Sequence, residues 1–224
     1  MTRIEVAQMI DISAVRTHHT LQDIARTVEI AKKYRFVNVH SLPTWTADVR
    51  RLLLDEPDIR VGAPVGFPCG GHTSKVKIAE ARRLLIDGVQ EMDIVMNVGR
   101  FKSGEYNYVL DELRQIIALA RPNVLNKVII ELNCLDDNEI EKACELTILS
   151  GADYLKTGTG WVPGNANLER IARIKQYTQD RIKVKAAGGI RTREDFDRLI
   201  DLGVERMGIN TEAALEIVES FPKA

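Results

Sequence analysis

The sequence predicts a single-domain (β/α)8 barrel, the TIM-barrel class of α/β fold, over residues 1–224. Short apolar runs alternate with longer helical patterns along the whole chain, and this alternation is typical of a parallel sheet covered by helices. No glycine-rich dinucleotide turn follows the first apolar run, so eight such units favour a closed barrel over an open sheet. No linker or low-complexity run divides the 224 residues, which suffice for one core.

The predicted strands are short apolar runs, and several of the helices between them begin with recognisable capping signals. Asp136 with Glu139, and Thr192 with Asp195, have the spacing of a capping box, in which two residues at a helix start satisfy each other's backbone N–H groups. The predicted strands span residues 9–12, 36–39, 60–65, 91–95, 128–132, 154–157, 182–186 and 206–209. The predicted helices span residues 20–34, 44–55, 74–88, 106–120, 137–150, 167–179, 193–202 and 211–220.

Composition and charge exclude several classes of protein. The formal net charge is −1 at pH 7, which gives no basic surface for nucleic acid. No window is long and apolar enough for a membrane span, and the N-terminal residues lack the apolar core of a signal peptide. The three cysteines, Cys69, Cys134 and Cys144, are odd in number and have no metal-ligand spacing. We therefore expect a cytoplasmic protein with no nucleic-acid or membrane partner.

Two lysines stand near the C-terminal ends of neighbouring predicted strands, where a barrel places its chemistry. Lys156 lies in the run 154–157, and Lys185 lies near the end of the next run. If Leu155 packs against the helices, Lys156 points into the barrel mouth, because side chains alternate between the faces of a strand. Many strand lysines only reach solvent. However, two neighbouring ammonium groups depress each other's pKa, and a lysine left neutral at pH 7 can form a Schiff base with a carbonyl.

Asp93 lies in the middle of an apolar strand, where an unpaired carboxylate is costly. It is either the structural partner of a buried cation or a proton carrier, and both interpretations place it near Lys156 and Lys185. Glu91 shares its face nearer the strand start. Asp11, at the end of the first strand, is a weaker candidate of the same kind.

The turns after the last two strands are candidates for binding an anion. Gly188 and Gly189 expose backbone N–H groups in a loop where such barrels commonly bind phosphate. Asn210 and Thr211 follow the last strand. They either form a simple helix cap or also present the N-terminus of the next helix to an anion.

Four segments carry the most specific pattern in the chain. They are YLKTGTG, VKAAGGIRTREDF, VGFPCGGHTSKVKIAEARRLLIDGVQEMDIVMNVG and ERMGIN, and they lie between about residue 60 and residue 211. Together they resemble the class I deoxyribose-phosphate aldolase family. The resemblance implies reversible cleavage of 2-deoxyribose 5-phosphate to acetaldehyde and glyceraldehyde 3-phosphate, without a metal or any other cofactor.

The resemblance also implies a role for each matching residue. Lys156 would form the Schiff base with the aldehyde donor, Lys185 would tune its pKa, and Asp93 would relay protons through a bound water. The remaining residues would bind the substrate, and they are Asp11, Thr159, Gly160, Trp161, Gly188, Gly189, Asn210 and Thr211.

The chain departs from the family pattern around the substrate. Trp161 stands where many members carry a lysine that helps to hold the phosphate, and Asn210–Thr211 replaces a serine pair. His40 stands where a cysteine is frequent, Asp11 is followed by Ile-Ser rather than His-Thr or Leu-Thr, and the tail SFPKA lacks the C-terminal tyrosine of some members. An indole adds apolar area and one N–H donor but no charge. We therefore expect Trp161 to weaken the preference for a 5-phosphate.

Two alternatives stay open from the sequence alone. The first is an aldolase of the same lysine mechanism that acts on a different or non-phosphorylated sugar. The second is a non-catalytic barrel used for binding or assembly, which the joint presence of Lys156, Lys185 and Asp93 disfavours. Barrels of this kind often form homodimers, but the sequence shows no exposed patch that identifies one.

Overall fold

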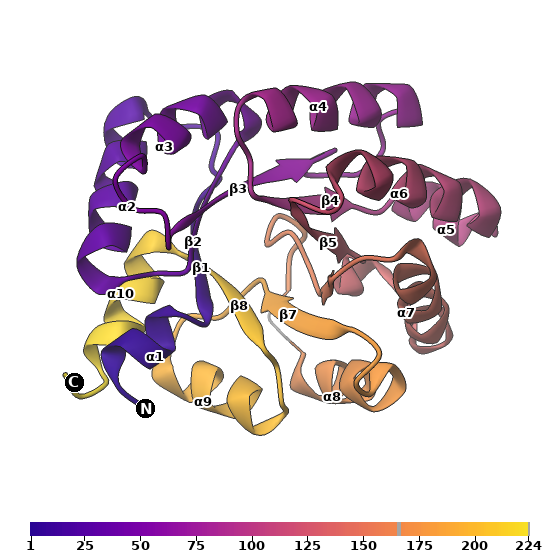
Figure 1. Cartoon of the computed structure of the whole chain (residues 1–224). Coiled ribbons are helices and arrows are strands. Elements are labelled where there is room, and N and C mark those ends of the chain that lie inside the picture. The colour runs from indigo at the N-terminus through magenta and orange to yellow at the C-terminus, as the bar shows by residue number, and fades with distance from the viewer. Residues whose placement is uncertain (165–166, 224) are drawn as a thin grey trace.

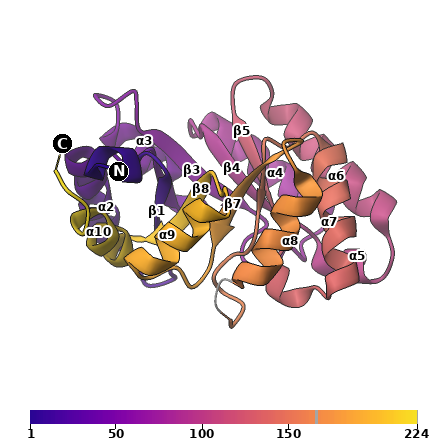
Figure 2. The same ribbon diagram turned by 90° about the horizontal axis from the view of Figure 1, so that it is seen from below.

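The protein folds as a closed parallel barrel of eight strands, each hydrogen-bonded to the next and the last to the first. The computed structural model describes residues 1–164 and 167–223; Asn165, Ala166 and Ala224, which the predicted span 1–224 includes, lie outside the described residues. Figure 1 shows the helices surrounding the ring of strands, and Figure 2 shows the same arrangement from below. The predicted (β/α)8 fold class is therefore confirmed.

Strands and helices alternate in chain order, with short additional helices at four places. The strands are β1 (Ile10–Ala14), β2 (Asn38–Ser41), β3 (Arg60–Val65), β4 (Glu91–Val95), β5 (Leu125–Ile129), β6 (Tyr154–Lys156), β7 (Lys183–Ala187) and β8 (Arg206–Asn210). The α-helices are α1 (Arg3–Ala7), α2 (Leu21–Tyr34), α3 (Thr46–Leu52), α4 (Ser74–Ile86), α5 (Val98–Lys102), α6 (Tyr106–Ala120), α7 (Asp137–Ser150), α8 (Leu168–Thr178), α9 (Arg193–Asp201) and α10 (Thr211–Glu219). Two 3₁₀ helices are η1 (Pro43–Trp45) and η2 (Leu132–Cys134).

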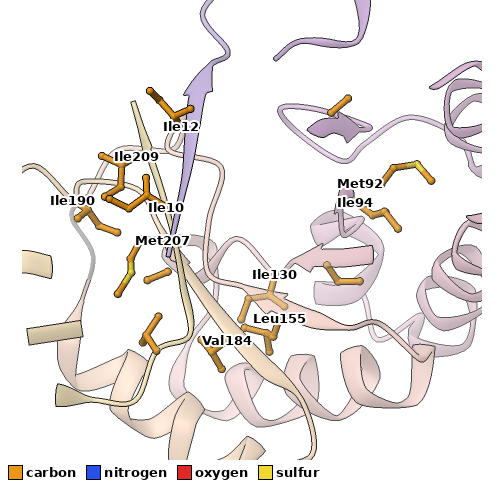
Figure 3. Packing of buried hydrophobic residues seen from close by; sticks show 14 of the residues in the cluster. Ile10, Ile12, Met92, Ile94, Ile130, Leu155, Val184, Ile190, Met207 and Ile209 are labelled. Atoms are coloured by element: carbon orange, nitrogen blue, oxygen red, sulfur yellow. The ribbon is translucent and has the colours of Figure 1, made fainter. Parts of the chain in front are cut away.

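The alternation of side chains along each strand separates an apolar layer from a polar interior. On β4, Met92 and Ile94 belong to the apolar core beneath the helices, whereas Glu91 and Asp93 form ion pairs inside the barrel. Figure 3 shows apolar side chains of this kind, including Leu155 of β6, around the barrel. Because the helices cover the apolar face of β4, its two charged side chains point into the barrel interior.

Helix starts were more predictable than the boundaries of β5. Both expected capping boxes are present, at Asp136 for α7 and at Thr192 for α9. The strand expected at residues 128–132 instead spans Leu125–Ile129, where Asp93 is in register with Lys127. A lysine near a strand start looks like a loop residue in the sequence, but here its ammonium group is paired inside the barrel.

The two ends of the described chain meet beside the barrel. Helices α1 and α10 lie side by side in both views. The guanidinium group of Arg3 donates hydrogen bonds to the carbonyl oxygens of Phe221 and Glu219, each at 2.9 Å. Helix α1 has no counterpart among the helices predicted from the sequence. Among the described residues, no helix combines the length and the apolar character needed to cross a membrane.

Candidate active site

A cavity of about 580 Å³ opens at the C-terminal ends of the strands. It collects side chains and turns that lie far apart in the sequence but at one end of the barrel. Nine of the residues expected from the sequence line it: Asp11, Lys156, Thr159, Gly160, Trp161, Lys185, Gly188, Gly189 and Asn210. Asp93 lies directly beneath this set, within hydrogen-bond distance of two of its lysines.

Lys156 ends β6 with its ammonium group at the floor of the cavity. It is 7% exposed, and its Nζ donates to Asp93 Oδ2 at 2.8 Å. Burial, together with the positive charge of Lys185, lowers the pKa of Lys156 to about 8, although Asp93 opposes this shift. A substantial fraction of Lys156 is therefore a neutral amine near pH 8, which is the nucleophilic form.

Asp93 is the point at which three lysines meet. Its Oδ2 also accepts from Lys185 Nζ at 2.8 Å, and its Oδ1 accepts from Lys127 Nζ at 3.1 Å. Burial alone would raise the pKa of this carboxyl, but His40 and the three lysines hold it well below the usual value. Asp93 is therefore an anion at neutral pH, and Lys156 and Lys185 share one of its oxygens.

A second layer of charges lies deeper in the barrel. Lys127 contacts Glu91, and it lies 3.2 Å from Asp11. Asp11 also accepts from Lys185, and from Arg206 Nη1 at 2.7 Å. Although burial opposes ionisation, these cations hold the pKa of Asp11 well below its usual value, while the carboxylates raise the pKa of Lys127 and of Arg206.

The buried cluster holds more positive than negative side chains. Four cations share three carboxylates: Lys127, Lys156, Lys185 and Arg206 against Asp11, Glu91 and Asp93. With every group ionised, these buried side chains carry a net charge of +1, and an uncompensated buried charge is costly. Release of one proton removes this excess. Lys156 has a lowered pKa, whereas the pKa values of Lys127 and Arg206 are raised, so Lys156 is better suited than either to release it.

His40 of β2 is a polar residue of the cavity that makes no hydrogen bond to the described residues. It is 4% exposed, and neither ring nitrogen has a partner; its Nε2 lies 3.6 Å from Asp93 Oδ2. Burial lowers the pKa of His40 to about 3, so the ring is neutral at pH 7. Gly62 of β3 makes room for it, because a Cβ there would lie 2.2 Å from His40 Nδ1. The imidazole is thus available to a bound molecule or a water.

Glu131, which is not among the site residues predicted from the sequence, joins the turn after β6 to the end of β5. Its carboxylate accepts the backbone N–H of Thr159 at 3.2 Å and also accepts from the Thr159 hydroxyl. That hydroxyl in turn accepts the backbone N–H of Trp161 at 3.1 Å. Gly158 leaves space for this contact, since a Cβ there would lie 2.9 Å from Glu131 Oε1. The sequence signal is a glutamate directly after an apolar strand, where barrel chemistry is located.

The turns after β6 and β7 touch each other at the mouth. Gly160 and Gly188 have φ angles of 73° and 96°, in the left-handed region that favours glycine. A Cβ on Gly160 would lie 3.7 Å from the Cα of Gly188. The backbone of both turns is therefore accessible to a ligand at close range.

Asn210, the last residue of β8, and Thr211, the first residue of α10, have different surroundings. Asn210 lines the cavity, and its Oδ1 also accepts the backbone N–H of Ala213 at 3.0 Å. Thr211 is not among the residues that line the cavity. Its buried hydroxyl lies 3.1 Å from the Thr27 hydroxyl and 3.4 Å from the Ser13 carbonyl oxygen. Thr211 therefore packs α10 onto β1 and α2.

Three residues of the site have the ligand types of a metal centre. Asp11, His40 and Asp93 each offer a ligand atom, and these atoms lie within 4.8 Å of one another. However, the carboxylates already accept hydrogen bonds from Lys127 and Lys185. Several ammonium groups at this range repel a divalent cation, so the arrangement does not fit a metal.

Comparison with known proteins assigns the chain to a family. The model of the DeoC/LacD family aldolases matches residues 6–210. The chain belongs to the DeoC/LacD aldolase family. A deoxyribose-phosphate aldolase of Sinorhizobium medicae (strain WSM419) is 44% identical over 214 residues, covering 96% of this chain and 86% of the relative.

Two solved structures described as aldolases have the same barrel. A protein described as QR15, an aldolase, superposes with a TM-score of 0.91 at 35% identity, covering 97% of this chain and 96% of that one. A deoxyribose phosphate aldolase from Aeropyrum pernix, described as having a unique tetrameric structure, superposes with a TM-score of 0.89 at 26% identity. The alignment covers 98% of this chain and 92% of the Aeropyrum protein.

Proposed function

We propose that this protein is a class I aldolase that reversibly cleaves 2-deoxyribose 5-phosphate to acetaldehyde and glyceraldehyde 3-phosphate. The observation that carries the proposal is Lys156, a buried lysine with a pKa lowered to about 8 at the floor of the barrel cavity. Membership of the DeoC/LacD family, and relatives named deoxyribose-phosphate aldolase, support the reaction class. The excess of positive charge around Lys156 supports its role as the nucleophile.

The proposed reaction uses the open-chain aldehyde form of the sugar. Neutral Lys156 Nζ adds to the C1 carbonyl, and loss of water gives an iminium ion. Removal of the proton from the C3 hydroxyl breaks the C2–C3 bond; its electron pair forms an enamine, and glyceraldehyde 3-phosphate leaves. Protonation of the enamine at C2, followed by addition of water, releases acetaldehyde and regenerates the lysine.

Asp93 and Lys185 are assigned electrostatic and proton-transfer roles beside that lysine. Asp93 contacts Lys156 and Lys185 through one oxygen, so it can hold both while water carries protons between them and the substrate. Lys185 keeps the pKa of Lys156 low through its positive charge. Its ammonium group also contacts Asp11, which holds it at the bottom of the cavity.

The test is chemical trapping of the Schiff base. Sodium borohydride in the presence of acetaldehyde is expected to add a two-carbon unit to the peptide that contains Lys156, as located by mass spectrometry. Lys156→Leu should abolish both labelling and turnover, whereas Lys183→Leu, an exposed lysine of the neighbouring strand, should retain both. Labelling of another lysine, or turnover that EDTA abolishes, would contradict the proposed mechanism.

Location and assembly are further parts of the proposal. Three free cysteines are consistent with the expected reducing cytoplasm, and fractionation of the host cell tests this. A homodimer remains the expected assembly. Analytical ultracentrifugation decides between that state, a monomer, and the tetrameric state described for the Aeropyrum relative.

A further inference from the structure

The rim of the cavity carries two arginine side chains. Arg16 follows β1, is exposed, and lines the cavity together with Arg191, which follows β7. In the described part of the chain, neither guanidinium group lies within ion-pair distance of a carboxylate. The acidic residue of the same rim is Glu212 in the first turn of α10.

The side chain of Arg16 crosses the mouth to the turn after β6. Its guanidinium carbon lies 5.4 Å from the centre of the Trp161 ring, and its Nη2 lies 3.4 Å from the carbonyl oxygen of Gly160. Trp161 is in turn held edge-on by Phe67, at 5.7 Å between ring centres and an interplanar angle of 86°. A guanidinium group over an indole face is attracted by the ring, which limits the positions of an otherwise mobile arginine.

The Arg16 side chain, which reaches from the end of β1 to the turn after β6, spans the two turns best suited to bind an anion. Around the barrel, β7 and β8 lie between β6 and β1. The turn of Gly188 and Gly189 after β7, and Asn210 at the end of β8, therefore lie between the two ends of the bridge that Arg16 forms, and they line the same cavity. An anion bound by these backbone groups would have the guanidinium group of Arg16 across the mouth from it.

We propose that Arg16 is a specificity-determining residue that binds the terminal phosphate of the sugar, and that Trp161 positions it. This inference rests on the proposed function and deepens it. The planar guanidinium group presents paired N–H donors that fit two phosphate oxygens, and it stays charged at any relevant pH. Taken alone, an uncharged side chain at position 161 predicts a weaker preference for a phosphate. In the structure, the indole contacts a cation, Arg16, from the loop after β1.

The experiment compares kcat/KM for 2-deoxyribose 5-phosphate and for 2-deoxyribose across a set of variants. Arg16→Gln is expected to lower the ratio of the two values by about 10- to 100-fold, the range for a lost charge-assisted hydrogen bond. Arg16→Lys keeps the positive charge but lacks the paired N–H donors of the guanidinium group, so it should lower the ratio by less. Trp161→Ala should lower the ratio by about 2- to 5-fold, because it removes an exposed cation–π contact, and Trp161→Phe should lower it less.

Two controls separate this inference from the proposed function. Arg82→Gln, an exposed arginine on α4, should leave the ratio at the wild-type value. Titration calorimetry with inorganic phosphate should show a dissociation constant about 10-fold or more higher in Arg16→Gln than in the wild type. If neither sugar is cleaved by the wild type, the proposed function is wrong, and the calorimetric result still tests Arg16. An unchanged ratio in Arg16→Gln, or a loss confined to Arg191→Gln, would overturn the assignment.

Discussion

The chemistry of Lys156 depends on the charges around it as much as on its own burial. The strand-end positions of Lys156, Lys185 and Asp93 could be predicted from sequence, because period-two alternation and eight repeated units place them at one end of a barrel. Lys127 could not be predicted in the same way. The sequence predicts the strand at residues 128–132, three residues later than it lies, so Lys127 falls outside the predicted strand and nothing in the sequence places it beside the carboxylates that it joins.

Removal of the neighbouring charge tests the electrostatic role of Lys185. The amine of Lys156 must be neutral to react, so kcat/KM is expected to rise with pH through about 8 and then level off. In Lys185→Leu the cations that remain equal the carboxylates in number, which stabilises protonated Lys156 and raises its pKa. The pH at which the residual kcat/KM rises should therefore be higher than in the wild type by about one pH unit or more.

The matched control for this pH profile is Lys183→Leu, which removes an exposed lysine from the same strand. It should reproduce the wild-type profile. If the rising part of the pH profile stays at the wild-type position in Lys185→Leu, the charge of Lys185 does not set the pKa of Lys156.

At the level of elements, the helices were easier to anticipate than the connections that shape the mouth. Capping boxes at Asp136 and Thr192 rest on local hydrogen bonds, so their spacing is visible in the sequence. The contact between Glu131 and Thr159 joins two strand ends that are 28 residues apart, and it needs a left-handed Glu131 with φ of 52°. A non-glycine residue in that conformation is unusual, and only the tertiary contact reveals it.

Glu131 should therefore matter for the turn that contains Thr159 and Trp161. Glu131→Ala removes the acceptor of a buried backbone N–H and of a hydroxyl, which is expected to cost about 1–3 kcal/mol of unfolding free energy. Because the turn is then less fixed, kcat/KM should also fall. Urea denaturation and steady-state kinetics measure the two effects, with Glu141→Ala, an exposed glutamate of α7, as the control. Equal stability of the two variants would show that Glu131 does not hold the turn.

At the level of the whole molecule, a charged interior makes the barrel sensitive to acid. His40 has a folded pKa of about 3 and an unfolded value of about 6.5. Below pH 6.5 the unfolded chain therefore takes up a proton that the folded chain does not, and stability falls as pH falls. Asp11 and Asp93, whose folded pKa values are well below normal, add to the loss below about pH 4.

We expect the free energy of unfolding to fall by up to about 1.4 kcal/mol per pH unit between pH 6 and 4.5 on account of His40. Urea denaturation at several pH values measures this slope. His40→Asn should reduce the slope by that amount, even if the variant is less stable overall, whereas His72→Asn, which changes an exposed histidine, should not. Parallel slopes for the wild type and His40→Asn would contradict the assignment of a neutral, buried His40.

The contact between the two ends of the described chain bears on whether the order of the strands along the chain can be changed. Strand β8 pairs with β1 in the same parallel manner as every other neighbouring pair, and Arg3 ties α1 to the backbone after α10. The pairing of β8 with β1 is therefore no different in kind from the pairing of the strands that follow each other in the chain. A short peptide joining the two ends, with new ends opened at the exposed turn around Gly104, would give a circular permutant that contains every strand pair. The unit with which the chain begins is then set by how the chain is synthesised and not by its folded architecture.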